Sequence, residues 1–215
     1  MIAMRADIRL WTAVAVIGIC GFAVARGIGI VHFALALADV GSAESRAAIA
    51  KNWGTAPDVA STALQADLNY QIDPSDQKAA EHRRQTVAAL ALIEPMSSSN
   101  WLSLSGLQLI TDQPMDQVFD SLELSMLTGP NEGDVAVERA VFEASLWERL
   151  PADLKNRAAL DVATMMVPQT QAEAEAIGKF RAVLATQPDW VRNELREALV
   201  ASGVRPQDIE KQLGF

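Results

Sequence analysis

Residues 95–133, PMSSSNWLSLSGLQLITDQPMDQVFDSLELSMLTGPNEG, contain one complete helical hairpin with helix-breaking residues at both ends. A proline and three serines open it, and an apolar-rich helix is predicted over residues 101–110. The turn at residues 111–114 ends in a proline that we expect in the first turn of the next helix. Gly129 and Pro130 end that second helix, because glycine accepts the left-handed conformation past a helix end and proline cannot continue a helix.

The second helix of this hairpin carries a single apolar stripe. Its members follow one another at the spacing of one helix face: Met115, Val118, Phe119, Leu122 and Met126. A helix with such a stripe must bury it against another helix. Pro95 and Pro130 lie 35 positions apart, close to the roughly 34-residue period of tetratricopeptide (TPR) hairpins. The spacing therefore predicts stacked helical hairpins.

The composition predicts an all-α fold. Half of the 215 residues are hydrophobic but only 6% are aromatic, and stretches that alternate apolar and polar residues over the length of a strand are missing. The net charge is −9 and no helix is rich in lysine or arginine. Because this charge repels phosphate backbones, no nucleic-acid partner is expected. The one cysteine, Cys20, excludes a disulfide within the chain.

The N-terminal part predicts a membrane anchor. Residues 1–9 form a short cytoplasmic head, and residues 10–38 form a transmembrane or signal-anchor helix and its exit. A bilayer core about 30 Å thick needs about 20 helical residues. Residues 10–30 supply that length, with the Arg26 guanidinium extended to the interface. We therefore expect one contact of the protein to be the lipid bilayer.

A cleaved signal peptide is the alternative interpretation of this segment, because a basic head, an apolar run and a small-x-small site ending at Ala25 fit that pattern too. The uncleaved anchor is favoured, because apolar sequence resumes at once over residues 27–38. Arg5 and Arg9 favour a cytoplasmic head. The prediction is a single-pass protein of a bacterial inner membrane whose helical domain is periplasmic.

Three further regions follow the anchor. Residues 39–56 are polar and predict a linker that leaves the membrane, residues 57–203 a helical hairpin repeat domain, and residues 204–215 a C-terminal tail. Asp73 and Asn131 are predicted helix caps. The remaining helices of the repeat domain are predicted over residues 57–70, 74–93, 132–149, 153–166, 171–186 and 188–202.

No catalytic, cofactor-binding or metal-ligating residue is predicted. Ser97 to Ser99 lack the G-x-S-x-G pattern of a nucleophile, and helix capping accounts for them better. His82 lies among charged neighbours on an expected solvated face. Four carboxylates are not expected to share one face with a partner: Glu138, Glu143, Glu148 and Asp153.

One turn and one tryptophan are the candidate interaction residues. The turn is a candidate partner-binding or inter-hairpin turn and consists of Gly129, Pro130, Asn131, Glu132 and Gly133. It lacks the Gly-Lys-Ser/Thr ending of a phosphate-binding loop, so backbone geometry is favoured over anion binding. Trp147 is the second candidate. Together with Trp101 and Trp190 it is spaced like a core anchor, and a sugar-stacking platform is the alternative.

The runs WLSLSGLQLI (101–110), QVFDSLELSMLTGPNEG (117–133) and ERAVFEASLWERLPADLKNRAALDVA (138–163) resemble a family of membrane-anchored, TPR-like accessory proteins. This family belongs to alphaproteobacterial exopolysaccharide and O-antigen polymerisation systems. Residues 127–133 and 146–151 are the most specific pieces of the resemblance. It implies a non-enzymatic role beside membrane proteins of a polysaccharide polymerase, ligase or export complex.

Three hypotheses follow from these features. The first is a membrane-tethered helical scaffold that assists bacterial surface polysaccharide polymerisation or export through protein–protein contacts. The second is an accessory structural subunit of another membrane complex. The third is a glycan-acting enzyme, which would need paired acids or a Tyr/His couple in a cleft, although Tyr70 is the only tyrosine.

Overall fold

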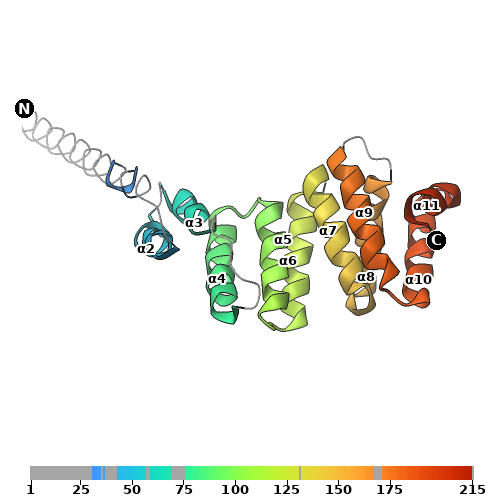
Figure 1. Ribbon diagram of the computed structural model, residues 1–215, viewed down its shortest axis with the longest axis horizontal. Coiled ribbons are helices and arrows are strands. Elements are labelled where there is room, and N and C mark those ends of the chain that lie inside the picture. Colours follow the sequence, from blue (N-terminus) through green and yellow to red (C-terminus); the bar gives the residue numbers. More distant parts are fainter. Residues whose placement is uncertain are drawn as a thin grey trace, which may run out of the picture. The chain divides into compact units, whose positions relative to one another are not determined.

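The computed structural model describes residues 31–34, 36, 43–56, 59–68, 76–130, 132–166 and 171–214. Every regular element among these residues is a helix, which confirms the predicted all-α class. The chain divides into two compact units, Met1–Gln71 and Ile72–Phe215. Figure 1 shows the helices of both units, coloured along the chain.

The described part of the first unit includes the short helices α2 (Ala43–Trp53) and α3 (Ala60–Leu68). Helix α2 lies within the predicted linker, so this region is more ordered than its polar composition indicates. A small core holds the unit together, and in it the rings of Phe33 and Trp53 lie 5.7 Å apart, tilted by 60°. Ile49, Val59 and Ala63 complete the buried part of this core.

The predicted transmembrane segment falls almost entirely outside the described residues. In the part of the chain that the structure describes, no helix has both the length and the apolar character needed to cross a bilayer. The end of the predicted anchor region is described at residues 31–34 and 36, where the chain is helical and Phe33 is buried.

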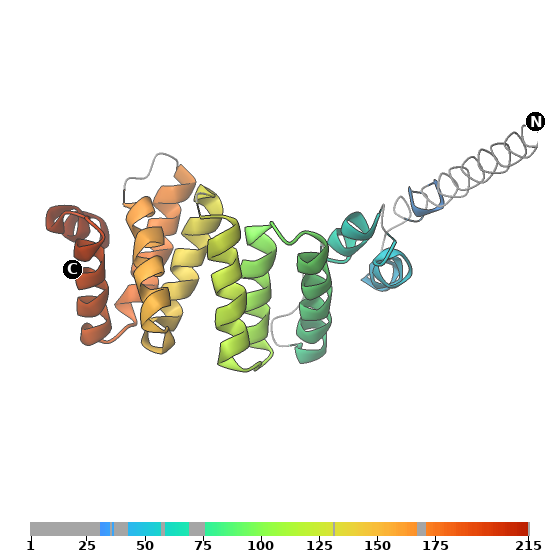
Figure 2. The ribbon, with the colours of Figure 1, turned by 180° about the vertical axis from the view of Figure 1, so that it is seen from behind.

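The second unit carries the remaining helices. They are α4 (Gln77–Ile93), α5 (Ser98–Ile110), α6 (Met115–Thr128), α7 (Gly133–Leu146), the short 3₁₀-helix η1 (Trp147–Arg149), α8 (Ala152–Met165), α9 (Gln171–Ala185), α10 (Asp189–Ala201) and α11 (Pro206–Leu213). Helix α5 packs between α4 and α6. It also contacts α7, α7 contacts α9, and α8 contacts α10. Both views show α4 to α10 side by side (Figures 1 and 2).

The predicted α5–α6 hairpin is present, and α5 begins three residues earlier than expected, at Ser98. A Schellman motif ends α5: the Gln113 amide donates to the Gln108 carbonyl and the Asp112 amide to the Leu109 carbonyl. Asp112 takes the left-handed position of this motif, with φ of 54°. Pro114 immediately precedes α6 rather than lying in its first turn.

The core of the second unit is formed by the stripes that the helical period predicts. On α6, Val118, Leu122 and Met126 are buried, while Met115 and Phe119 are partly buried and pack against the same core. The other helices contribute buried residues at the same spacing: Val137, Ala140 and Ala144 of α7, Leu154, Ala158 and Val162 of α8, Ile177, Phe180 and Leu184 of α9, and Val191, Leu195 and Leu199 of α10.

Helix boundaries differ from the prediction at three places. Helix α4 is capped by Asp76, whose carboxylate accepts hydrogen bonds from the amides of Lys78 and Ala79, and not by Asp73. Glu132 precedes α7, whereas the predicted cap Asn131 lies outside the described residues. Residues 204–215 are not a simple tail, because Pro206 opens α11 and Ile209 of this helix is fully buried.

Candidate functional site

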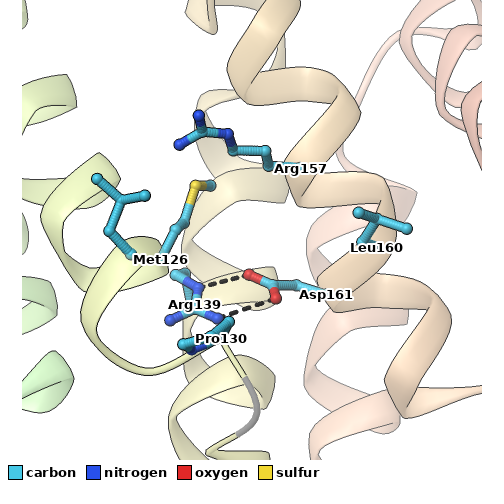
Figure 3. A pocket seen from close by; sticks show the side chains of 7 residues that line it. Met126, Pro130, Arg139, Arg157, Leu160 and Asp161 are labelled. Atoms are coloured by element: carbon cyan, nitrogen blue, oxygen red, sulfur yellow. Dashed lines mark hydrogen bonds and ion pairs between the residues drawn. The ribbon is translucent and has the colours of Figure 1, made fainter.

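A pocket of about 240 Å³ lies in the second unit between the end of α6, the turn after it, α7 and α8 (Figure 3). Its lining residues are Met126, Leu127, Pro130, Arg139, Arg157, Leu160 and Asp161. Aliphatic side chains and a proline supply most of this lining, and three charged side chains supply the rest. We take this pocket as the candidate functional site.

The inner wall of the pocket is a buried ion pair between α7 and α8. Nε of Arg139 lies 2.5 Å from one carboxylate oxygen of Asp161, and Nη2 lies 2.9 Å from the other. Figure 3 shows the two groups facing each other. The Arg139 side chain is fully buried and Asp161 is nearly so. A bidentate pair of this kind fixes both side chains and joins the two helices.

The same arginine also holds the end of α6. Its Nη1 donates to the carbonyl of Ser125 at 3.1 Å and lies 3.3 Å from the Ser125 hydroxyl. Arg139 therefore connects α6, α7 and α8 at one point. Its charge is neutralised by Asp161, which leaves it little capacity to bind an additional anion.

Glu143 lies one helical turn beyond Arg139 and is also buried. Its nearer oxygen is 3.8 Å from Nε of Arg139, and neither carboxylate oxygen accepts a hydrogen bond from a described donor. Burial, with the negative charge of Asp161 as a second cause, raises the pKa of Glu143 well above 4.5, and Arg139 offsets only part of this. Burial thus favours the protonated form of Glu143 more than water does.

The mouth of the pocket carries both charged and apolar side chains. Nη1 of Arg157 lies 2.9 Å from a carboxylate oxygen of Glu123, so an exposed ion pair bridges α8 and α6. Leu127 is 59% exposed and Leu160 is 55% exposed. The two leucines give the mouth of the pocket exposed apolar surface.

The candidate turn at residues 129–133 borders this pocket through Pro130. The Ser98 hydroxyl donates a hydrogen bond to the Glu132 carboxylate, so a negative charge already lies beside the turn. This arrangement favours the structural interpretation of the turn over anion binding. Asn131 lies outside the described residues, and a Cβ atom on Gly133 would meet nothing within 4 Å.

Gly129 ends α6 for a reason that the sequence does not reveal. Its φ is −138°, which is not the left-handed conformation that we expected. A Cβ atom at this position would lie 2.4 Å from Oγ and 2.5 Å from Cβ of Ser98. Glycine is required here because α5 approaches the backbone closely.

The three tryptophans differ in their environment. Trp147 is 1% exposed, and its Nε1 donates to Glu194 at 3.1 Å. Lys155 binds the same carboxylate at 2.9 Å and lies 5.8 Å from the Trp147 ring centre. Trp101 is partly buried, and Trp190 is 49% exposed, so the prediction of a core anchor is wrong for Trp190. A buried Trp147 cannot serve as a surface for sugar stacking.

The sequence analysis identifies Pro130 but none of the charged residues that line the pocket. Arg139 lies beside Ala136 and Ala140, and Asp161 beside Ala158 and Val162, so both charges are within apolar stripes. A charge in such a position is a signal of a buried pair. The spacing of the carboxylates predicts no partner for Glu143, yet in the structure Glu143 faces both members of the pair.

Among the described residues, no group of three or more His, Cys, Asp or Glu is placed to hold a metal ion. His82 is exposed on α4. Comparison of the chain with protein-family models, with curated proteins and with solved structures gives no match.

Proposed function

We propose that this protein is a non-enzymatic, membrane-tethered helical scaffold that assists polymerisation or export of a bacterial surface polysaccharide by holding a partner protein. The observation that carries the proposal is the pocket between α6, α7 and α8, whose mouth exposes Leu127 and Leu160. Two exposed leucines beside a preformed hollow offer a partner an apolar contact without rearrangement of the scaffold.

The packing order of the helices supports a TPR-like arrangement. The first helices of successive hairpins are α5, α7 and α9. Helix α5 contacts α7, α7 contacts α9, and α8 contacts α10 of the following hairpin. Stacked hairpins of this kind present extended surfaces for protein segments. The predicted anchor at residues 10–30 would keep this surface beside a membrane complex, and the resemblance of residues 88–163 connects it with polysaccharide systems.

The buried cluster supports a scaffold rather than an enzyme. Arg139 and Asp161 are bonded to each other, and Glu143 is covered by protein on all sides. A general acid or base must reach the proton that it transfers. These groups therefore stabilise the junction of three helices, and the pocket offers surface and shape to a partner.

The test is purification of the tagged full-length chain from membranes in mild detergent. We expect a polysaccharide polymerase, ligase or export protein in stoichiometric amount, and we expect deletion of the gene to change the amount or chain length of the surface polysaccharide. A stoichiometric neighbour from an unrelated membrane complex would contradict the proposal, and so would an unchanged polysaccharide. Turnover of the polysaccharide by the purified chain would contradict the non-enzymatic role.

A further inference from the structure

The pocket has room for one large side chain. An apolar cavity of about 150 Å³ in a protein interior binds benzene, and this pocket measures about 240 Å³. Met126 and Pro130 belong to its lining, and Leu127 and Leu160 are exposed beside it. An aliphatic side chain that entered here would bury the exposed leucines together with itself.

One charged side chain of the pocket, Arg157, uses only part of its hydrogen-bonding capacity within the fold. Arg139 and Asp161 neutralise each other, so Arg157 is the remaining charged residue of the lining. Only Nη1 of Arg157 bonds Glu123, and no hydrogen bond from its Nε or Nη2 is found within the described residues. Figure 3 shows Arg157 extending from α8 above Met126. The Nε–Nη2 edge of the guanidinium therefore has donors without a partner among the described residues, in the geometry that matches a carboxylate.

The apolar and charged contacts are neighbours on one helix. Arg157 and Leu160 are three residues apart on α8, so they lie on the same face, with Cβ atoms roughly 5–6 Å apart. A partner that uses both contacts must carry its own apolar and acidic groups at a similar spacing, as two side chains one helical turn apart do. An acidic side chain of an internal segment meets this requirement.

We propose that the pocket binds an internal segment of a partner protein in which a large aliphatic side chain and an Asp or Glu lie within one helical turn of each other. The aliphatic side chain enters between Leu127 and Leu160, and the carboxylate accepts hydrogen bonds from Nε and Nη2 of Arg157. This inference rests on the proposed function and specifies the partner. The overall charge of −9 does not prevent it, because long-range repulsion is screened beyond about 8 Å at physiological ionic strength.

The first test is selection of random peptides, displayed between fixed flanking sequences, on the immobilised full-length chain. The flanks ensure that only internal segments are offered. We expect enrichment of peptides with Leu, Ile or Met within four residues of Asp or Glu. Changing the acid of an enriched peptide to its amide should weaken binding about ten-fold, the value of one good charge-assisted contact. Enrichment of peptides without an acid would overturn the proposal, and so would enrichment that does not depend on the pocket.

The second test uses variants of the chain. R157Q and L160D should each weaken binding of an enriched peptide about ten-fold or more. E123Q should strengthen it, because a competing carboxylate is removed. R192Q and L92D are the matched controls, since both residues lie on the surface of other helices, and they should leave binding unchanged. If R157Q and E123Q weakened peptide binding equally, binding would depend on the ion pair between α6 and α8 and not on the free donors of Arg157. This result would overturn the proposal.

The same variants separate this inference from the proposed function. If the wild-type chain retains its polysaccharide partner from membranes and R157Q retains it in equal yield, the inference fails and the scaffold role stands. If the wild-type chain retains no such partner, the scaffold role itself fails. Helical circular dichroism of each variant verifies that the chain is folded.

Discussion

Ser98, in the first turn of α5, donates a hydrogen bond to the carboxylate of Glu132, which directly precedes α7. The two residues are 34 positions apart, so this bond joins the beginnings of two successive hairpins. Gly129 lies against the same serine. The turn that the sequence marks as a candidate interaction site is thus first of all the place where one hairpin packs on the next.

Replacement of Gly129 with alanine should destabilise the second unit by about 1–3 kcal/mol, the usual cost of forcing an extra carbon into a packed site. The added Cβ would lie 2.4 Å from Oγ of Ser98, so either α5 or the turn must move. Thermal unfolding of the full-length chain, followed by helical circular dichroism, measures the change.

Gly106 provides the matched control. It lies within α5, where a Cβ atom would meet nothing within 4 Å. G106A should therefore stabilise the chain by roughly 0.5–1 kcal/mol, because alanine is the better helix former. If G129A were as well tolerated as G106A, the close approach at Ser98 would not determine the turn.

Removal of Asp161 should cost more than any surface substitution. D161A leaves the buried guanidinium of Arg139 without its counter-ion, and we expect a loss of about 3–5 kcal/mol in the free energy of unfolding. The double variant R139M/D161L should recover most of this loss, because packed apolar side chains replace a buried pair at little cost. If the double variant were as unstable as D161A, apolar side chains could not replace the Arg139–Asp161 pair, and the prediction would be wrong.

The free energy of unfolding should depend on pH in part through Glu143. Folding raises the pKa of this acid above 4.5, so the folded chain binds a proton that the unfolded chain releases. The stability that Glu143 contributes is fully present below pH 4.5 and declines as the pH rises toward its pKa in the folded chain. Arg139 and Asp161 are the charged groups that face it.

E143Q isolates this contribution, because its amide stays neutral at every pH. Hydrogen exchange of residues 134–146 should speed up with rising pH more in the wild-type chain than in E143Q, after correction for the intrinsic pH dependence of exchange. An identical pH dependence in both proteins would show that Glu143 keeps the same protonation state in the folded and unfolded chains.

Truncation of Trp147 should show how much the contact between η1, α8 and α10 contributes to stability. W147A should cost about 3–5 kcal/mol, as is usual for a buried tryptophan. W147F keeps an aromatic ring in the core and loses the hydrogen bond to Glu194, so its loss of stability should be smaller than that of W147A. W190A serves as the control, because half of that side chain is exposed, and its effect should be the smallest of the three in thermal unfolding.

The local features of the fold could be predicted because the helical period is strong. The buried residues of α6 repeat at the spacing of one helix face, and glycine or proline marks the ends of most helices. Exact helix starts were less predictable, because capping depends on which side chain reaches the free amides: Asp76 and Asp73 both fit the pattern, and Asp76 makes the bonds. Trp190 was misplaced because it is adjacent to Val191, and neighbouring positions on a helix face different directions.

The pocket could not be predicted, because its parts come from three helices. Arg139 and Asp161 are 22 positions apart, and no local pattern indicates that they meet. A charged residue inside an apolar stripe shows only that some partner must be present. Which residue fills that role depends on how α7 and α8 pack, and this is a property of the tertiary structure.

The most direct test of the account is site-specific photo-crosslinking in living bacteria, with the reactive amino acid at Leu160 of the full-length chain and, as a control, at Leu92. Both side chains are exposed, and only Leu160 lines the pocket. We predict one dominant adduct from position 160 with a membrane protein of the polysaccharide assembly system, no such adduct from position 92, and loss of the adduct when R157Q is added. No adduct at position 160, or equal adducts from both positions, would contradict the account.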